Sequence, residues 1–78
     1  MAFVAIARAV FDYEIQEEGE LALTENEIVY IIEKDQEGNE GWWRGKSKSQ
    51  EIEGLFPSSY VEEVLHYLIY IYEFIIYI

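Results

Sequence analysis

Between residues 1 and 64, short apolar stretches alternate with short polar ones. Leu21 and Leu23 are two residues apart, which is the period of a strand that buries one face. Four of the five residues at 28–32 are β-branched, a composition typical of a strand. Residues 47–50 are polar and are interpreted as a turn. The pattern predicts a small antiparallel barrel or sandwich whose strands lie at residues 3–11, 21–23, 28–32, 42–45 and 52–56.

Residues 65–78 depart from this pattern, because twelve of these fourteen residues are apolar or aromatic. A membrane-spanning helix needs about 20 apolar residues, and this segment is shorter and contains Glu73. Its composition favours strand addition, and packing as a helix on its own domain or on a second copy is the alternative. Three interpretations stay open, in this order: an oligomerisation segment, a truncated or appended segment without selected function, and an interfacial membrane anchor. The sequence therefore divides into a domain at 1–64 and a hydrophobic tail at 65–78.

The composition narrows the classes of function. Sixteen acidic residues against five basic ones give a formal net charge of −11. This charge repels the phosphates of nucleic acids and disfavours anionic membrane surfaces, and it favours a basic protein partner. The chain has no cysteine and one histidine, so we expect no thiol nucleophile, no metal site and no other cofactor. No basic segment precedes the apolar start of the chain, so no signal peptide is predicted and the cytoplasm is the expected compartment.

Three motifs follow one another along the chain. The first reads A-V-F-D-Y at residues 9–13, and an acidic loop separates it from E-L-A-L at 20–23. The second is the pair Trp42-Trp43, and the third reads G-L-F-P-S-S-Y-V at 54–61. Over about residues 5–64 they resemble the SH3 domain, whose signatures are A-L-Y-D-Y, D/E-L-S/T-F and G-L-F-P-S-N-Y-V. Residues 13–22 are also similar to the first SH3 domain of fungal endocytic adaptors of the actin cytoskeleton.

The resemblance implies an all-β fold, a small SH3-like five-stranded antiparallel barrel with an apolar C-terminal tail. It also implies binding to proline-rich PxxP segments of other proteins. Such segments form a stiff left-handed helix whose prolines fit between aromatic rings. Phe11 and Tyr60 would form one proline pocket, and the second would be formed by Tyr13, Trp42, Pro57 and Tyr60. Tyrosine and tryptophan also carry donors for the free carbonyls of the ligand.

The acids of the first loop are the expected partners of an Arg or Lys that flanks the proline core. By resemblance, Glu20 aligns with the main specificity acid of the family, and Glu17 and Glu18 align with its helpers. An arginine–carboxylate contact is charge-assisted and directional. Glu37 and Glu40, in the loop before Trp42, are interpreted as solvated charges in preference to ligand contacts.

Two positions depart from the family pattern. Phe11 stands where tyrosine is usual, so one hydroxyl is lost while the ring remains. Ser59 stands where asparagine is usual, and it can still donate to a ligand carbonyl with a shorter reach.

Trp43 is expected to face away from the ligand, because neighbouring strand residues point to opposite sides. The resemblance places the core at Ala7, Ala9, Leu21, Leu23, Val29, Ile31, Gly45, Phe56 and Val61.

No arrangement of residues supports catalysis. The only histidine, His66, lies in the tail among aromatic residues, and no glycine-rich phosphate loop occurs. We therefore predict that the chain is not an enzyme but an interaction module of a signalling or cytoskeletal adaptor. The alternative hypothesis is a structural element that self-assembles through residues 65–78 into a homo-oligomer, or that associates with a membrane.

Overall fold

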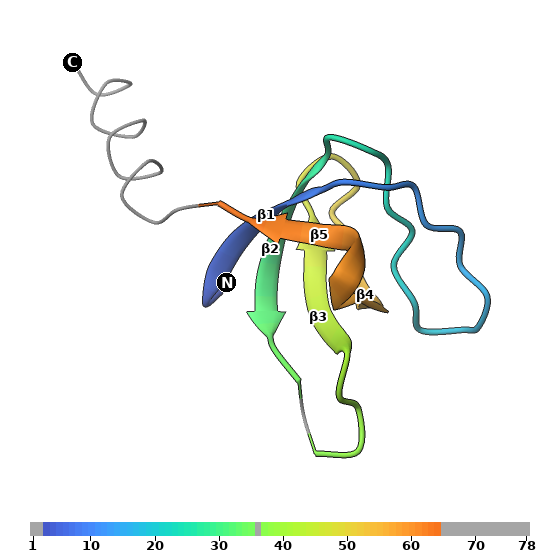
Figure 1. Ribbon diagram of the computed structural model, residues 1–78. Helices are drawn as coiled ribbons and strands as arrows, with labels where there is room; N and C mark the ends of the chain where they lie inside the picture. Colours follow the sequence, from blue (N-terminus) through green and yellow to red (C-terminus); the bar gives the residue numbers. More distant parts are fainter. Residues whose placement is uncertain (1–2, 36, 65–78) are drawn as a thin grey trace.

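A computed structural model describes residues 3–35 and 37–64 of the chain. The described residues form five strands and one short 3-10 helix, and all paired strands are antiparallel (Figure 1). In chain order these elements are β1 (Ala5–Ala9), β2 (Ile28–Glu33), β3 (Trp42–Ser47), β4 (Glu53–Pro57), η1 (Ser58–Tyr60) and β5 (Val61–Glu63). The predicted all-β fold with five antiparallel strands is confirmed. The predictions for the tail 65–78 lie outside the described residues.

The order of strands across the sheet is β4-β3-β2-β1-β5, so the last strand of the chain returns to the first. Pro57 and η1 turn the chain between β4 and β5, and the N–H of Val10 donates to the carbonyl of Tyr60 across this corner. Within 3–35 and 37–64, no helix has the length and apolar character needed to cross a bilayer.

One predicted strand is wrong. The apolar pattern predicts a strand at 21–23, but this part of the chain makes only isolated bridges. Leu23 exchanges hydrogen bonds with Tyr13, whereas the N–H of Leu21 donates to the carbonyl of Leu55 on β4. The two leucines face the core as predicted, but they pair with different segments, so no continuous ladder forms. The fifth strand is β5, which pairs with β1.

The core lies on the inner face of the sheet and contains the buried hydrophobic side chains Ala7, Ala9, Tyr13, Leu21, Leu23, Val29, Ile31 and Phe56. The predicted core is confirmed except at Val61, which is half-buried because β5 is a three-residue edge strand.

Ser47, predicted in a polar turn, is instead the fully buried last residue of β3. Its hydroxyl accepts the N–H of Gln50 at 3.3 Å and lies 3.2 Å from Ser49 Oγ, so it is buried with partners.

The loop between β1 and β2 is held directly against β4. The N–H of Leu21 donates to the carbonyl of Leu55 at 2.7 Å, and the N–H of Leu55 donates to the carbonyl of Gly19 at 3.0 Å. Gly54 permits this approach, because a Cβ at that position would lie 2.9 Å from backbone atoms of Gly19, Glu20 and Leu21. The backbone of Glu20 is therefore fixed relative to the sheet.

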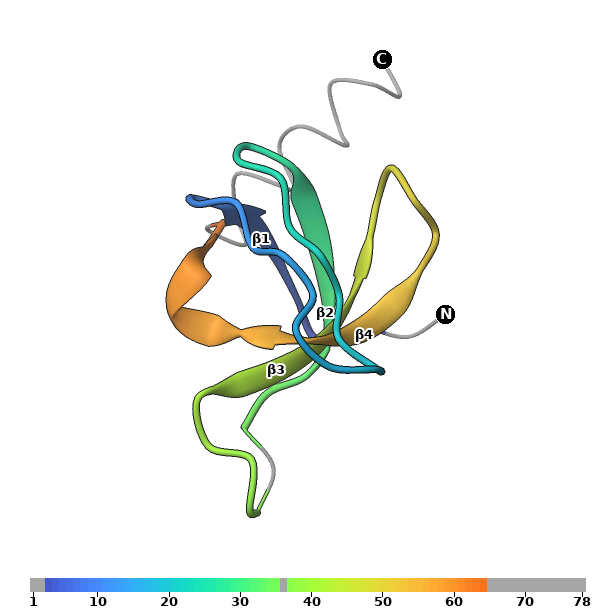
Figure 2. The ribbon, with the colours of Figure 1, turned by 90° about the vertical axis from the view of Figure 1, so that its right-hand side faces the viewer.

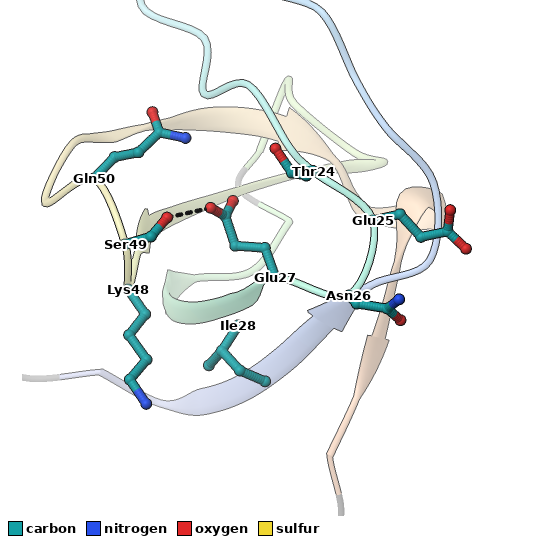
Figure 3. Close-up of a pocket in the computed structure, with 8 residues that line it drawn as sticks. All are labelled: Thr24, Glu25, Asn26, Glu27, Ile28, Lys48, Ser49 and Gln50. Atoms are coloured by element: carbon teal, nitrogen blue, oxygen red, sulfur yellow. Dashed lines mark hydrogen bonds between the residues drawn. The ribbon is translucent and has the colours of Figure 1, made fainter.

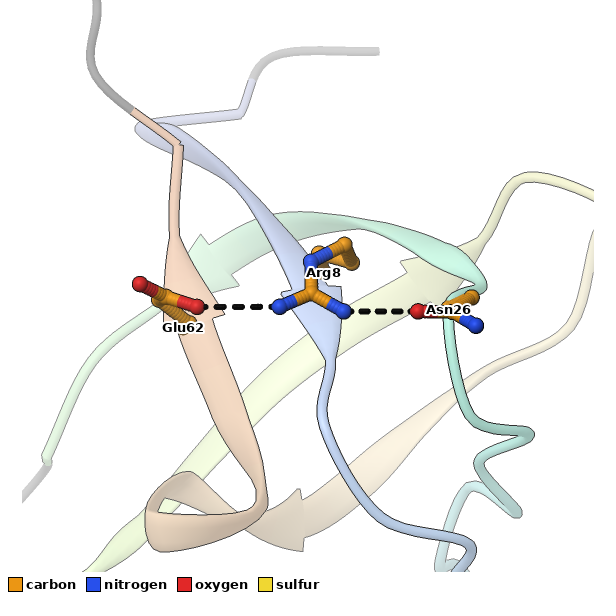
Figure 4. A network of polar contacts seen from close by, with 3 residues as sticks. All are labelled: Arg8, Asn26 and Glu62. Carbon is orange, nitrogen blue, oxygen red and sulfur yellow. Dashed lines mark hydrogen bonds and ion pairs between the residues drawn. The ribbon is translucent and has the colours of Figure 1, made fainter.

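Arg8 ties three segments together on the outer face of the sheet (Figure 4). Its guanidinium donates to Asn26 Oδ1 at 2.7 Å and to Glu62 Oε2 at 3.0 Å. Asn26 adopts the left-handed conformation, with φ of 73°, which asparagine tolerates better than most residues. These exposed contacts orient β5 and the turn before β2, and a pair of this kind contributes at most about 1 kcal/mol.

Candidate functional site

Four aromatic side chains form a continuous row across one side of the molecule. The row runs Phe11, Tyr60, Tyr13, Trp42, with ring centroids 5.8, 5.5 and 6.2 Å apart in turn. Each neighbouring pair packs edge to face, with interplanar angles between 77° and 79°. This geometry is favourable for aromatic pairs, so the rings support one another and keep their spacing.

Three segments distant in the sequence supply this row. Phe11 and Tyr13 follow β1, Tyr60 ends η1, and Trp42 begins β3. Figure 2 shows how these segments meet: the loop after β1 crosses in front of β4, with η1 on one side of it. Phe11 is 58% exposed while Tyr13 is only 8% exposed, so Phe11 lies at the rim of the row and Tyr13 forms its floor.

A groove opens beside the Trp42 end of the row. It has a volume of about 390 Å³, and its walls are Tyr13, Gln16, Glu17, Glu20, Trp42 and Pro57. Trp42 and Pro57 are directly opposite one another in the ladder between β3 and β4, so an aromatic ring and a proline ring flank the groove from adjacent strands. The groove thus brings together Tyr13, Trp42 and Pro57 of the four residues predicted for the second proline pocket. The fourth, Tyr60, contacts the Tyr13 ring but does not line the groove.

A carboxylate lies at the loop side of this groove. Glu20 Oε1 accepts the backbone N–H of Gln16 at 2.9 Å and the hydroxyl of Tyr13 at 2.7 Å. These two hydrogen bonds hold the pKa of Glu20 below its ordinary value of 4.5, with the Gln16 N–H as the larger cause. Glu20 is therefore ionised at neutral pH. A backbone hydrogen bond from Glu17 lowers the pKa of Glu20 further, and burial of the carboxyl opposes these effects.

The same hydrogen bond shifts the pKa of Tyr13 in the opposite direction. The hydrogen bond to Glu20, helped by burial, raises the pKa of Tyr13 from 10 to about 12. The hydroxyl hydrogen of Tyr13 is therefore committed to Glu20. Tyr13 is among the tyrosines expected to donate to ligand carbonyls, and in this structure its donor is used by Glu20.

The other predicted site residues differ in how closely they approach the groove. Glu17 is exposed and lines it, whereas Glu18 is exposed and lies outside the lining. Ser59 is exposed on η1. Its neighbour Ser58 is not free, since its N–H and its Oγ both contact the carbonyl of Gly41, at 2.9 and 3.1 Å.

Charge is unevenly distributed over the described residues. The ion pairs join Arg8 to Glu62, Lys34 to Glu63, and Arg44 to both Glu33 and Glu53. None of these pairs includes Glu17, Glu18 or Glu20, so within the described part of the chain the acids beside the groove have no basic partner at ion-pair distance. The edge of the groove is thus negatively charged.

One residue of the site, Gln16, does not follow from sequence reasoning. Gln16 lines the groove and donates its backbone N–H to Glu20, a role that its side-chain type does not signal.

Trp43 packs under Lys34, whose Nζ lies 4.9 Å from the ring centroid. Trp43 Nε1 is buried and has no hydrogen-bond partner among the described residues. Trp43 thus packs away from the aromatic row, in agreement with strand alternation.

A second, larger hollow lies between the turn before β2 and the turn after β3 (Figure 3). It has a volume of about 630 Å³ and is lined by residues 24–28 and 48–50. Within it, Ser49 Oγ donates to Glu27 Oε2, while Glu27 Oε1 is buried without a partner among the described residues. No aromatic side chain lines this hollow, so it lacks the feature that distinguishes the first groove.

Comparison with known proteins places these features in a family. The family model described as "SH3 domain" matches residues 8–58. The chain is 38% identical over 68 residues to the actin cytoskeleton-regulatory complex protein sla1 of Sclerotinia sclerotiorum, covering 81% of this chain and 6% of that protein. It is 51% identical over 55 residues to mitogen-activated protein kinase kinase kinase 10 of Xenopus laevis, covering 68% of this chain and 5% of that one. Across the curated relatives, the chain spans between 5% and 11% of their length.

Solved structures agree with this result. The yeast Nbp2p SH3 domain in complex with a peptide from Ste20p matches with a TM-score of 0.70 and 33% identity, covering 83% of this chain and 94% of that one. The C-terminal SH3 domain of myosin IB from Entamoeba histolytica, bound to a GEF peptide, matches with a TM-score of 0.68 and 33% identity, covering 85% and 91%. Both structures contain a bound peptide, so the match extends to domains that act by binding peptides.

Proposed function

The chain belongs to the SH3 domain family, a family of peptide-binding interaction modules, and from this premise we propose that it binds proline-rich PxxP segments that carry a flanking Arg or Lys. The observation that supports the proposal best is the aromatic row ending beside an ionised carboxylate. Such a surface complements a peptide that presents apolar proline ridges and a positively charged side chain next to them. The domain would comprise residues 1–64, with residues 65–78 outside it.

The aromatic row suits a polyproline II ligand for a physical reason. That helix has three residues per turn and no internal hydrogen bonds, so it is stiff before it binds and loses little entropy on binding. In the proposal, the edge-to-face pair of Phe11 and Tyr60 receives one proline-containing turn. The groove between Trp42 and Pro57, with Tyr13 as its floor, receives the next.

The carboxylates supply specificity. Glu20 would accept the flanking Arg or Lys through Oε2, because Oε1 already holds two hydrogen bonds. Arginine is favoured over lysine, since its planar fork presents two parallel donors to a carboxylate. Glu17, at the groove wall, would assist directly, and the exposed Glu18 would act through its field. Ser59 would donate to a ligand carbonyl from η1.

The larger protein context is also part of the proposal. Relatives include regulators of the actin cytoskeleton and a kinase, and in each the matched part is a small fraction of the whole. We place this domain in a cytoplasmic adaptor of cytoskeletal, endocytic or signalling type. The matched residues provide recognition without catalysis, and any reaction would belong to another part of such a protein.

The test is an array of proline-rich peptides probed with the full chain of 78 residues. Each peptide is presented with arginine at its N-terminal flank, at its C-terminal flank, or with alanine in place of arginine. We expect saturable binding that needs both prolines and one arginine, with the preferred flank giving the ligand orientation. Failure to bind any proline-rich sequence at micromolar concentrations would contradict the proposal.

A further inference from the structure

The outer face of the sheet carries an apolar surface that the groove does not use. We name it the outer patch and define it as Phe3, Val4, Ile6, Ile28 and Tyr30. Ile6 and Tyr30 are directly opposite one another in the ladder of β1 and β2. The residue that follows each of them is buried in the core, so both side chains point to the outer side. The ring centroids of Phe3 and Tyr30 lie 5.0 Å apart, and Phe3 and Val4 are 46% and 67% exposed.

Two lysines continue this face on the next strand. Lys46 is directly opposite Tyr30 in the ladder of β2 and β3, and the N–H of Lys48 donates to the carbonyl of Ile28 at 3.1 Å. Ser47, between the two lysines, is buried, so strand alternation places both lysines on the outer side. Figure 3 shows the side chains of Lys48 and Ile28 extending in the same direction. Lys46 and Lys48, which we name the lysine pair, thus border the outer patch along β3.

The lysine pair is free of the ion pairs that occupy the other cations. The chain has five basic residues, and three of them, Arg8, Lys34 and Arg44, are paired with acids. Glu53 is opposite Lys46 in the ladder, but its carboxylate contacts Arg44 at 3.4 Å. Over residues 3–35 and 37–64, neither lysine of the pair has an ion-pair partner. A chain of net charge −11 therefore presents two unpaired cations beside an apolar surface.

The dimensions of this face match those of one α-helix. The strands β1, β2 and β3 are neighbours in the sheet; three such strands span about 10 Å, and a helix with its side chains has a diameter of about 10–12 Å. The two lysines are two strand positions apart, about 7 Å, and side chains at positions i and i+4 of a helix are about 6 Å apart. A helix that lies along the strands would therefore place an apolar stripe over β1 and β2 and an acidic edge over β3.

We propose that the outer patch and the lysine pair form a second docking surface, which binds an acidic amphipathic helix of a partner protein. The apolar stripe of this helix covers Phe3, Ile6 and Tyr30 and removes their apolar surface from water. Two of its carboxylates contact the lysine pair and fix the register of the helix on the sheet. Charges more than about 8 Å away are largely screened at physiological ionic strength, so the lysine pair attracts a carboxylate that touches it although the chain as a whole is acidic.

A narrow helix suits this face better than two other occupants. A flat anionic membrane would also approach Glu53 and Glu62, which lie on the same face opposite Lys46 and Arg8, and it would be repelled by them. A second copy that docked through the same face would bring two lysine pairs together, because a two-fold interface joins identical surfaces. A helix that carries its acids along one edge meets the lysines and avoids these acids.

The test uses the full chain of 78 residues, isotope-labelled for amide NMR, and a synthetic probe. The probe is an amphipathic helical peptide of about 18 residues, with leucines along one side and glutamates at i and i+4 along its edge. The control probe carries lysines in place of these glutamates. At about 0.15 M salt, we expect the acidic probe to cause saturable shifts at Ile6, Tyr30 and Lys46 and none at Trp42 in the groove. The control probe should bind about tenfold more weakly or worse.

Variants of the full chain separate the lysine pair from the net charge. Lys46→Gln and Lys48→Gln should each weaken binding of the acidic probe about threefold. Lys34→Gln is the matched control and should leave the affinity unchanged, because Lys34 lies over Trp43 and contacts Glu63, outside the outer patch. Equal losses in all three variants, or no shifts at the outer patch, would overturn the proposal.

Two further measurements decide between the helix and the other occupants. The spectrum of the full chain is recorded at several protein concentrations without the probe, and also with vesicles that contain phosphatidylserine. Shifts of the outer patch that grow with protein concentration would overturn the proposal in favour of a second copy. Shifts caused by the vesicles but not by the acidic probe would overturn it in favour of a membrane.

Discussion

The hydroxyl of Tyr13 donates a hydrogen bond of 2.7 Å to Oε1 of Glu20. This contact joins the floor of the aromatic row to the carboxylate proposed to hold the ligand's cation. It keeps Tyr13 neutral by making loss of its proton unfavourable beside a negative charge. The apolar and charged halves of the site are therefore coupled through one hydrogen bond, and the coupling has measurable consequences.

The first consequence concerns alkaline pH. The folded pKa of Tyr13, about 12, lies above its ordinary value of 10. Folding thus favours the protonated form, and this contribution to stability is complete below pH 10 and is lost as the pH rises through 12. We expect the unfolding free energy of the parent to fall more steeply over this interval than that of Tyr13→Phe. Urea unfolding at several pH values measures it, with Tyr60→Phe as the control that keeps the Tyr13–Glu20 bond. Parallel curves for the parent and Tyr13→Phe would contradict the assignment.

The second consequence concerns acid pH. The pKa of Glu20 is lowered from 4.5, so Glu20 stays mostly ionised at that pH. Its contribution to folding is present above the ordinary value and is lost as the pH falls through the lowered one. The affinity ratio between an arginine-flanked peptide and its alanine counterpart should therefore decline with a midpoint below pH 4.5, the ordinary pKa of a glutamate. Calorimetric titration at each pH gives the ratio. A midpoint well above pH 4.5 would assign the cation contact to a different group.

The third prediction separates Glu20 from the acids around it. Glu20→Gln retains an acceptor for Tyr13 and Gln16 but removes the charge, so we expect the fold to persist. Affinity for the arginine-flanked peptide should fall about tenfold or more, with no change for the alanine-flanked peptide. Glu18→Gln is the matched control, because it removes the same charge from an exposed position outside the groove lining. Equal losses for the two variants would mean that only net charge matters.

The fourth prediction uses the two adjacent tryptophans as a pair. Trp42→Ala removes one wall of the groove and should lower affinity for every PxxP peptide about tenfold or more. Trp43→Ala should preserve peptide affinity and lower the unfolding free energy by about 1–3 kcal/mol, because Trp43 packs against the core and under Lys34. Fluorescence titration and urea unfolding are measured on both variants. The reverse assignment of the two effects would contradict the orientation of β3.

The fifth prediction tests how the acidic loop is positioned. Gly54→Ala would place a Cβ 2.9 Å from the backbone of Glu20, and relieving that clash must move the loop. We expect a loss of about 1–3 kcal/mol in stability and a weaker preference for arginine. Gly45→Ala is the control. Its Cβ would lie 2.8 Å from Phe56 Cε1 and from the carbonyl oxygen of Tyr30, and it would leave Glu20 untouched. It should lower stability similarly while keeping the arginine preference, as competition between the two peptides will show.

Much of the fold and of the candidate site is predictable from the sequence, because both depend on residue type at a given spacing. The apolar residues at 28–32 form β2, and the A-V-F-D-Y motif places Phe11 and Tyr13 beside Tyr60. Trp42 and Pro57 fall opposite one another once β3 and β4 pair. Side-chain chemistry is sufficient to identify these positions.

What the sequence does not predict depends on backbone contacts between distant segments. Leu21 and Leu23 carry a strand pattern but pair with two different partners, so no strand forms there. Gln16 acts through its N–H, which every residue except proline has. Ser47 is polar but buried, because the turn after β3 supplies its hydrogen bonds. None of these features leaves a signal in residue type.

The close contact of the acidic loop with β4 joins residues 19–21 to residues 54–55. Since the aromatic row likewise extends from Phe11 to Tyr60, a fragment that lacks either of these segments contains only part of the surface. A ligand of the groove will therefore recognise only the completely folded domain and will stabilise it by mass action in proportion to its concentration. Folding and peptide binding are thus thermodynamically linked, and a higher concentration of the partner increases the fraction of the protein that is folded.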